Sequence, residues 1–287
     1  MLRLHQKSYT ESILREFGFK KCNSVATPMD PGTRLSPQTD AISIEDAQRV
    51  REFPYTAFVG KCMYLSTCTQ PDISYTVREL ARFMSSYGPS HITAAKHLLR
   101  YLKGTASYGI ILGGQSETLH PLLKGLTDSD WGMGDTRKSV SGFLIMMGNS
   151  PLSWSLKQQA VVALSSCKAK YLASTHCARD ILWFRNLFAE LGIPQIQPTT
   201  LFCDNQGTVA CMHDPHAHSK MKHIAICEHF ICNCVMKRLI DVMHVSNKEN
   251  IADLFTKLLH RVLHARWVKM LRLDASQGGV LNGDPAS

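Results

Sequence analysis

The sequence predicts an α/β domain that follows a mostly helical front region. In the first 118 residues, apolar side chains recur at helical spacing in several short segments. Later in the chain, strand-like segments give way to helices that alternate with strands, which is the pattern of an α/β domain. We therefore expect three parts: a front region over 1–118, an α/β domain over 119–274 and a disordered tail over 275–287.

The front region contains two well-marked helices. Residues 7–19 carry apolar side chains at helical spacing, and Gly18 marks the end of the segment. Residues 91–105 place their leucines and alanines on one face, and Gly104 ends this helix. A proline-rich loop over 26–40 lies between the two helices, and the stretch 112–121 marks the boundary with the next region.

The sequence of the α/β region predicts five strands and one long helix. The helix over 163–191 is amphipathic, and Gly192–Pro194 stops it. Three strands precede this helix and two follow it. The first expected strand lies in 121–131 and runs into a turn at Asp128–Asp130. The others lie at two places within 139–156 around a turn at Gly148–Asn149, at 199–205 and at 239–245. The remaining expected helices are 206–212, 221–238 and 250–260.

The chain of 287 residues is basic, with a formal net charge of +9 and a pI of about 9.1. Such a surplus favours a polyanionic partner, with nucleic acid first and an acidic membrane surface second. No apolar run reaches the roughly 18 residues of a membrane-spanning helix, and none of signal-peptide length opens the chain. The ten cysteines are unevenly spread, so we expect reduced thiols in an intracellular protein of the cytoplasm or nucleus.

Three aspartates stand where strands end or a helix begins. Asp128 follows one expected strand, Asp204 follows another, and Asp253 lies near the start of the helix at 250–260. Carboxylates at one edge of a sheet can hold Mg²⁺, a hard ion that prefers oxygen ligands. Two such ions can activate a water and stabilise the leaving oxygen when a phosphodiester is cleaved. Aspartate also caps helices and turns, so spacing alone leaves that structural interpretation open.

The order of the motifs resembles one family. In the front region the matching runs are "LHQKSYTESILREFGFKKCNSVATPMD", "YTAFVGKCMYLSTCTQPDISYTV" and "HITAAKHLLRYLKGT". In the later region they are "TDSDWGMGDTRKSVSGFLIMMGNSPLSWSLKQQAVVALSS", "FCDNQGTVAC", "KHI…HF" and "ADLFTK". This series resembles the C-terminal part of the Pol polyprotein of copia-type retrotransposons, from the end of the reverse transcriptase through a connection region to the ribonuclease H domain.

The resemblance implies a ribonuclease H-like fold, in which helices flank a five-stranded mixed sheet, after a truncated reverse transcriptase and connection region. It implies hydrolysis of the RNA strand of RNA–DNA hybrids with two Mg²⁺ ions, with nucleic acid as the partner and no small-molecule substrate. The family's acidic ligands correspond to Asp128 in "TDSDW", Asp204 in "CDNQ" and Asp253 in "ADLFTK". The sequence has no Tyr-x-Asp-Asp motif and no Asp-Asp pair, so we expect no polymerase activity.

The family's fourth acid is replaced by a lysine. The resemblance places this glutamate on the long helix, in a segment that reads Ser-Ser-x-Glu-Ala-Glu-Tyr, whereas this chain has "SSCKAKY". Lys168 and Lys170 are about 200° apart around a helix, so only one can face the site, and the ligand corresponds to Lys170. Two unit charges about 4 Å apart interact by about 4 kcal/mol at an effective dielectric constant of about 20, and a divalent ion by about twice that. We therefore expect Lys170 to repel the metal and pair with Asp128 and Asp204, with catalysis weakened or lost.

Other functions stay open from the residues alone. Cysteines and histidines crowd 203–234 and could bind zinc, although their spacing fits no zinc finger and buried thiols are the simpler interpretation. The chain could also be a non-catalytic nucleic-acid-binding module or a translated relic without a function. The basic side chains for such a module would be Lys96, Arg100, Lys103, Arg137, Lys138 and Lys157. The tryptophans are most simply interpreted as core residues: Trp131, Trp154, Trp183 and Trp267.

Overall fold

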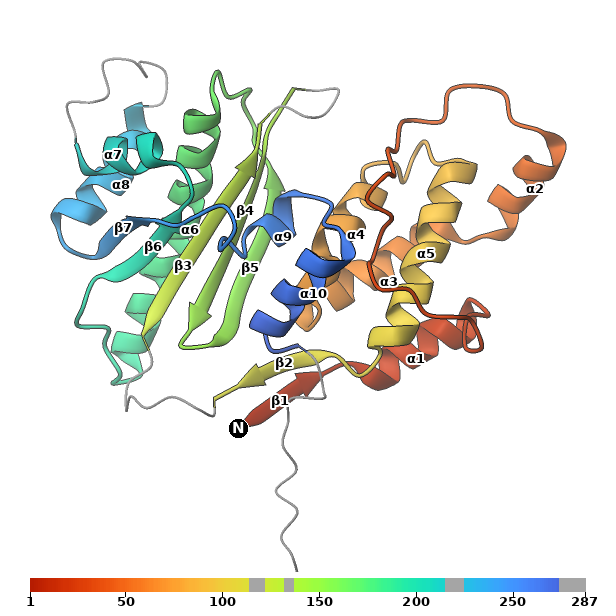
Figure 1. Cartoon of the computed structure of the whole chain (residues 1–287), viewed down its shortest axis with the longest axis horizontal. Helices are drawn as coiled ribbons and strands as arrows, with labels where there is room; N and C mark the ends of the chain where they lie inside the picture. The colour runs from red at the N-terminus through yellow and green to blue at the C-terminus, as the bar shows by residue number, and fades with distance from the viewer. Residues whose placement is uncertain (114–121, 132–136, 215–224, 274–287) are drawn as a thin grey trace, which may run out of the picture.

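The computed structural model describes residues 1–113, 122–131, 137–214 and 225–273, which form a helical region beside a sheet region (Figure 1). The side chains of 225–229 also lie outside this description. The tail expected over 275–287 and most of the boundary stretch 112–121 fall outside it as well. Within the described ranges, no helix is long and apolar enough to cross a membrane.

The front region packs its helices around one hydrophobic core. Ile13 and Leu14 of the first helix and Leu98 and Leu102 of the last contribute to this core, because residues three and four apart share a helix face. The structure confirms both of these helices, which the sequence predicted. The elements are α1 (Lys7–Glu16), α2 (Ile44–Glu52), α3 (Tyr55–Cys68), η1 (Pro71–Ile73), α4 (Ser74–Ala81) and α5 (Pro89–Thr105).

A five-stranded mixed sheet forms the centre of the second region, which confirms the predicted fold class. The strand order across the sheet is β5–β4–β3–β6–β7. β3, β4 and β5 are antiparallel neighbours, whereas β6 runs parallel to β3 and β7 runs parallel to β6. The strands are β3 (Leu123–Asp130), β4 (Val140–Met147), β5 (Ser150–Gln158), β6 (Thr199–Cys203) and β7 (Ile240–His244).

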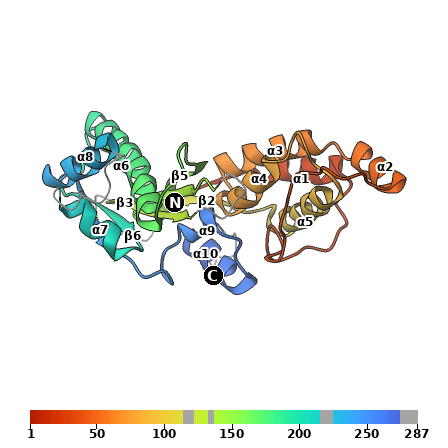
Figure 2. The same cartoon turned by 90° about the horizontal axis from the view of Figure 1, so that it is seen from above.

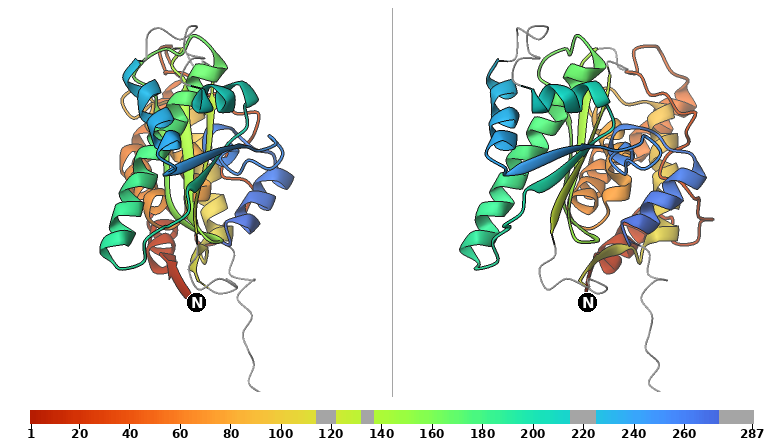
Figure 3. Two further views of the ribbon diagram at one scale, coloured as in Figure 1. Left: turned by 90° about the vertical axis from the view of Figure 1, so that its left-hand side faces the viewer. Right: turned by 60° about the vertical axis from the view of Figure 1, so that its left-hand side comes forward.

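Helices cover both faces of this sheet (Figure 3). One face carries α6 (Ser166–Glu190), α7 (Gln206–His213) and α8 (Ala225–Met236), and the other carries α9 (Asp253–Thr256) and α10 (Arg261–Met270). Alternate residues of β4 serve the two cores, because successive strand side chains point to opposite faces. Phe143 and Ile145 pack on the α6 side, and Leu144 and Met146 pack on the α10 side.

The single helix expected over 250–260 is wrong, since the chain forms the one-turn helix α9 and then the separate helix α10. The backbone becomes extended at Lys257 (φ −138°, ψ 149°), which ends α9. His260 then caps α10. The apolar residues of this segment give no sign of the break in the sequence. The break arises because Leu258 packs against the front core while Leu259 packs against the core under α10. Two different burial sites thus override the helical periodicity.

A two-stranded sheet that the sequence analysis missed joins the two regions. β1 (Leu2–His5) pairs antiparallel with β2 (Gly109–Leu112), and Ile110 of β2 enters the core under α10. The indole N–H of Trp154 on β5 donates to the carbonyl of Ser66 on α3 at 2.7 Å. Seen from above, α9 and α10 lie where the helical and sheet regions meet (Figure 2).

A buried carboxylate lies at the contact between η1 and α10. The Tyr101 hydroxyl donates to Asp72 at 2.6 Å, and burial raises the pKa of Asp72 to about 6. The ring of His264 on α10 lies 3.4 Å from the Asp72 backbone carbonyl, and burial lowers the pKa of His264 to about 4. At pH 7 the His264 imidazole is therefore neutral where α10 contacts the front region.

Two of the four tryptophans do not belong to the core, contrary to the sequence prediction. The side chain of Trp131 is 53% exposed and that of Trp183 is 60% exposed, whereas Trp267 is fully buried. The indole N–H of Trp131 donates to the carbonyl of Ala163 at 3.0 Å, which fixes the ring at the surface. Aromatic residue type alone does not separate these positions, because a satisfied indole N–H allows the ring to sit at a surface.

Candidate active site

The parallel pairing of β3 with β6 brings two of the predicted acids to one edge of the sheet. Thr127 pairs with Cys203, so Asp128 and Asp204 are the next residues on adjacent strands. The side chains of both acids are buried, since 0% of the Asp128 side chain and 2% of the Asp204 side chain are exposed. Asn205 accepts a hydrogen bond from the amide of Thr208 and so begins α7 immediately after the acid. This turn fixes the direction in which Asp204 leaves the sheet.

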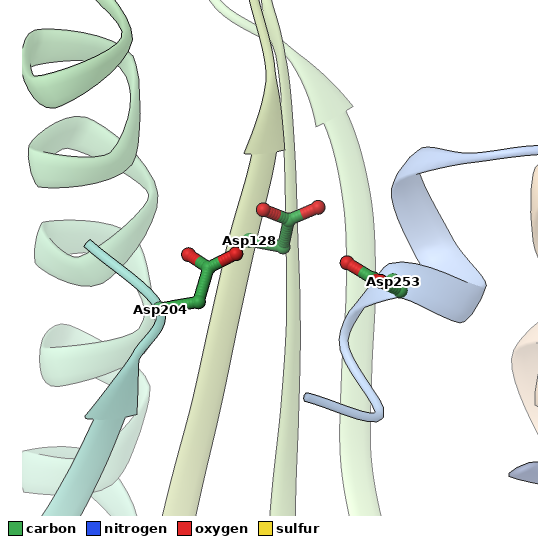
Figure 4. Close-up of side chains that lie close together, drawn as sticks. All are labelled: Asp128, Asp204 and Asp253. Carbon is green, nitrogen blue, oxygen red and sulfur yellow. The ribbon is translucent and has the colours of Figure 1, made fainter. Parts of the chain in front are cut away.

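The third acid comes from the other face of the sheet. Asp253 is the first residue of α9, and its side chain points towards those of Asp128 and Asp204 (Figure 4). Asn250 positions this turn, because its side chain donates to the Thr127 carbonyl at 2.9 Å and accepts from the Ala252 amide at 3.2 Å. Carboxylate oxygens of the three aspartates all lie within 4.8 Å of one another.

A glycine on β4 allows α9 to approach the acids. Gly142 pairs with Asp128 across the β3–β4 ladder. A Cβ atom at this position would lie 2.8 Å from Cβ of Phe255 and 2.8 Å from Cγ2 of Thr256. The hydroxyl of Thr256 also donates to Oδ2 of Asp128. The absence of a side chain at Gly142 therefore sets the distance between α9 and the first acid.

Gly142→Ala is expected to lower the free energy of unfolding by about 1–3 kcal/mol, because the added methyl group overpacks this contact. It should also move Asp253 away from Asp128. Urea denaturation measures the stability change. The matched control is Gly60→Ala on α3, where an added methyl group has no neighbour within 4 Å and alanine favours the helix by up to about 1 kcal/mol. Equal stability of the two variants would contradict the close approach.

Lys170 lies between the two acids at the strand ends. Its ammonium nitrogen is 2.6 Å from Oδ1 of Asp128 and 2.5 Å from Oδ1 of Asp204. Lys170 is in the first turns of α6, and its side chain is only 13% exposed. The ion pairs expected from the sequence are therefore present. At these separations the ammonium group occupies the space between the carboxylates.

Sequence reasoning missed a second lysine at the site. Nζ of Lys257 lies 2.7 Å from Asp253 and 3.4 Å from Oδ2 of Asp128. Four residues separate Asp253 from Lys257, a spacing that could have indicated this pair on a helix. Asn247 also reaches the site, since its amide group, when oriented to donate, lies 3.1 Å from Oδ2 of Asp204. Nothing in the local sequence indicates that contact.

The two lysines change the protonation of the acids. Burial alone would raise the pKa of Asp128, but the positive charges of Lys170 and Lys257 outweigh it and lower the pKa to about 2. Burial opposes the charged form of Lys170, yet the adjacent carboxylates raise its pKa above the ordinary value. Burial and the negative charge of Asp128 raise the pKa of Asp253 to about 6, although Lys257 opposes this. Asp128 and Lys170 therefore form a charged pair at neutral pH.

The donor set as it stands does not fit a divalent cation. Three carboxylates within reach of one point would suit Mg²⁺, which prefers oxygen ligands at about 2.0–2.1 Å. The ammonium of Lys170 instead takes the position between Asp128 and Asp204, and it can only donate hydrogen bonds. Lys257 adds a second positive charge on the side of Asp253. Two cations thus face three carboxylates.

Lys168 lies at the start of α6 and is part of the helix cap. Ser165 is the N-cap residue, and its hydroxyl accepts from the amide of Lys168 at 3.2 Å. The side chain of Lys168 is buried, and it forms no ion pair with any described residue. A glutamate three residues after the cap would complete a capping box and favour the positive helix end, whereas lysine does neither.

The cysteines and histidines do not gather around a possible metal position in the described part of the chain. There, the three aspartates are the only group of three or more such side chains within ligand distance of one another. Cys203, Cys232 and Cys234 are buried, and the His213 ring lies 2.8 Å from the Val242 carbonyl. Five members of the sequence cluster have side chains outside the description: His216, His218, His223, Cys227 and His229.

The six basic residues considered for phosphate binding lie in two separate places. One group is on α5, where the guanidinium of Arg100 donates to the Asn23 carbonyl at 2.9 Å. The other group belongs to the sheet region, near β4 and β5. The α5 group is Lys96, Arg100 and Lys103, and the sheet group is Arg137, Lys138 and Lys157. The six basic residues therefore belong to two different regions of the fold.

Fold and site together define a ribonuclease H-like α/β domain with an acidic strand-end cluster, preceded by a helical region. Over most of its length the chain is homologous to retrovirus-related Pol polyproteins of plant transposons. It is 34% identical over 261 residues to the Pol polyprotein of transposon TNT 1-94 from Nicotiana tabacum, covering 91% of this chain and 19% of that protein. It is 36% identical over 286 residues to that of transposon RE2 from Arabidopsis thaliana, covering 98% of this chain and 19% of that protein.

The chain therefore spans about a fifth of the length of these relatives. No protein-family model matches the sequence. Among solved structures, a ribonuclease H1 isolated from compost has 18% sequence identity and a TM-score of 0.35, covering 46% of this chain and 91% of that structure.

Proposed function

We propose that this chain is a ribonuclease H-like nucleic-acid-binding protein in which Lys170 closes the metal site. The observation that carries the proposal is the position of the Lys170 ammonium, 2.6 Å from Asp128 and 2.5 Å from Asp204. If Mg²⁺ were bound at such a site, carboxylates like those of Asp128, Asp204 and Asp253 would hold it, and it would supply activation of a water and stabilisation of the leaving oxygen of the RNA strand. Here Asp128, Asp204 and Asp253 are the proposed ligands that remain, and Lys170 marks the lost one.

The proposed partner is an RNA–DNA hybrid. The net charge of +9 favours a polyanion, and the relatives are Pol polyproteins of retrovirus-related transposons. Binding of the sugar–phosphate backbone depends on cationic side chains over a wide surface, so the loss of one carboxylate leaves it largely unaffected. We accordingly expect hybrid binding to persist where hydrolysis is weakened or lost. An intracellular location is part of the same proposal.

The proposed division of the chain follows the sequence prediction. We assign 1–118 to the end of a reverse transcriptase and its connection region and 119–274 to the ribonuclease H-like domain. Supporting this assignment, the front helices have their own hydrophobic core, and the sheet carries two further cores. β2 and α10 connect these regions, so the experiments below use the whole chain.

The purified chain is expected to bind a labelled RNA–DNA hybrid without cutting it in Mg²⁺ or Mn²⁺. Binding should weaken as salt rises, because cationic side chains release counterions from the phosphates. Gel electrophoresis of the labelled RNA strand measures cleavage, and fluorescence anisotropy measures binding. Strong Mg²⁺-dependent cleavage by the unmodified chain would refute closure of the site by Lys170. Absence of hybrid binding at low salt would reject the proposal that the chain binds nucleic acid.

A further inference from the structure

A basic groove lies in the front region between α1 and the end of α5. It has a volume of about 340 Å³. Lysine and arginine side chains from three segments line it: Lys7 and Arg15 from α1, Lys20 from the loop after α1, and Lys103 from the last turn of α5. Glu11 is the one acidic side chain in the lining. We propose that this groove binds the phosphate backbone of a nucleic acid.

The positive charges of the groove are mostly unbalanced. Glu11 lies 3.9 Å from Lys7, and both side chains are about half exposed, so this pair is weak. The other acid of α1, Glu16, pairs with Lys61 at 3.0 Å. In the described ranges, Arg15, Lys20 and Lys103 have no carboxylate within 4.0 Å. Like charges held together repel one another, and an anion in the groove removes that repulsion.

The backbone around the groove is fixed by packing and hydrogen bonds. Ile13 and Leu14 anchor α1 in the front core, which leaves Lys7, Glu11 and Arg15 on another face at four-residue intervals. Gly18 has a positive φ of 76°, and the amide of Phe19 donates to the Leu14 carbonyl at 2.7 Å. The helix therefore ends in a tight turn that starts the segment carrying Lys20.

The loop after α1 is also held against α5. The guanidinium of Arg100 donates to the Asn23 carbonyl at 2.9 Å. A Cβ atom at Gly104 would lie 3.0 Å from Cβ of Ser24, so loop and helix end are in close contact. Cations on such a fixed backbone lose less conformational freedom on binding than cations on a flexible loop. The groove is thus a preorganised anion site rather than a solvated charge run.

The arrangement of the cations favours a polyanion over a single small anion. The four side chains come from three segments and line a cavity that is large for one phosphate group. Outside the groove, the guanidinium of Arg3 donates to the carbonyl of Ser107, itself a lining residue, and extends the positive surface. Successive phosphates of a nucleic-acid strand can meet successive cations, whereas one anion meets only a few of them.

The choice of nucleic acid as the polyanion rests on the proposed function. The groove belongs to the front region and shares no residue with the acidic site, so it offers a contact for the same hybrid away from Asp128. Phosphate contacts position a nucleic acid without reading its sequence. The groove would therefore hold a hybrid in register without selecting its bases. Lys103, one of the basic residues singled out from the sequence, is part of it.

The test compares two triple variants of the whole chain. Arg15→Gln/Lys20→Gln/Lys103→Gln removes three groove cations, and Arg51→Gln/Lys237→Gln/Lys269→Gln removes three exposed cations elsewhere. Anisotropy of a labelled RNA–DNA hybrid is measured over a series of salt concentrations, with chelator present so that no cleavage occurs. Circular dichroism melting confirms that both variants are folded. All six side chains are exposed, so neither substitution set opens a core.

The groove variant is expected to show a salt dependence that is shallower by about 2–3 in log–log slope, because each phosphate contact contributes about 0.9. Between about 50 and 200 mM salt, its affinity should then fall about 40-fold less than that of the unmodified chain. The control variant should keep more of the original slope than the groove variant.

Three results would overturn the groove assignment, and they are distinguishable. Hybrid binding by the unmodified chain with equal slopes for both triple variants rejects the groove and leaves the proposed function standing. No hybrid binding by any form rejects the groove and the proposed function together. Loss of binding to vesicles of anionic phospholipid in the groove variant, with hybrid binding unchanged, shows that the groove serves a membrane surface and rejects nucleic acid as its ligand.

Discussion

Lys170→Glu is expected to turn the chain into a Mg²⁺-dependent nuclease that cuts the RNA strand of an RNA–DNA hybrid. The substitution removes the ammonium that lies between Asp128 and Asp204 and supplies a fourth carboxylate at the start of α6. Outer-shell changes at metal sites cost about 10–100-fold, so restoring a direct ligand should raise the cleavage rate by about 100-fold or more. Cleavage of the end-labelled RNA strand measures the effect.

A second measurement separates metal binding from catalysis. Without metal, four neighbouring carboxylates repel one another, so Lys170→Glu should melt at a lower temperature than the unmodified chain. Mg²⁺ at about 100 times its dissociation constant should stabilise the variant by about 2.7 kcal/mol, whereas the unmodified chain should respond little. Equal Mg²⁺ stabilisation of both forms would show that Lys170 does not close the site.

Two controls sharpen the comparison. Lys170→Gln removes the positive charge without adding a carboxylate, so it should gain neither strong metal binding nor cleavage. Lys170→Glu/Asp204→Asn has the new glutamate but lacks one of the acids at the strand ends, so it should lose the gained activity. Cleavage by the double variant at the rate of Lys170→Glu would remove Asp204 from the ligand set. If Lys170→Glu binds Mg²⁺ but does not cut the hybrid, the loss of catalysis has a cause other than Lys170.

Lys170→Met is expected to lower the free energy of unfolding at pH 7 by about 3 kcal/mol. Removing one partner of a buried ion pair leaves an uncompensated charge, which costs about 3–5 kcal/mol, and Lys257 compensates for part of it. Asp128 is fully buried, and its second oxygen lies 3.4 Å from Lys257. Urea denaturation of the two proteins in chelator measures the difference.

The same pair predicts how this effect depends on pH. Lys170 and Lys257 lower the pKa of Asp128 to about 2 in the folded chain, below the value of about 3.9 in an unfolded chain. A carboxyl group whose pKa is depressed by folding contributes stability above the unfolded value, and this is lost as the pH falls through the folded value. The difference between the unmodified chain and Lys170→Met should therefore shrink between about pH 4 and pH 2.

The double variant Lys170→Met/Asp128→Asn provides the control. Neutral groups of similar shape often replace a buried ion pair at little cost, so the double variant should recover much of the lost stability at pH 7. Its stability should also vary less between about pH 4 and pH 2, because the amide that replaces the Asp128 carboxyl group does not titrate. A double variant as unstable as Lys170→Met would show that the ion pair with Asp128 is not the cause.

The order of elements and the candidate acids could be predicted from the sequence because both depend on local patterns. Helical periodicity indicated α1, α5 and α6, and alternating apolar residues with turn glycines indicated the five strands. Asp128 and Asp204 were indicated by their places at the ends of two expected strands. The turn expected at Asp128–Asp130 is wrong, because β3 continues to Asp130 and pairs with β4 there. The substitution at Lys170 could also be recognised from the motif that contains it.

Only the tertiary structure determined what surrounds those acids. Lys257 and Asn247 reach the site through the packing of later segments, and the approach of α9 depends on the missing side chain of Gly142. The break between α9 and α10 arises because neighbouring leucines enter different cores. The basic groove likewise brings Lys103 at the end of α5 beside the cations of α1 and of the loop that follows it. Local sequence sets which conformations each segment favours, but long-range packing decides which charges become neighbours, and those neighbours set the chemistry of the site.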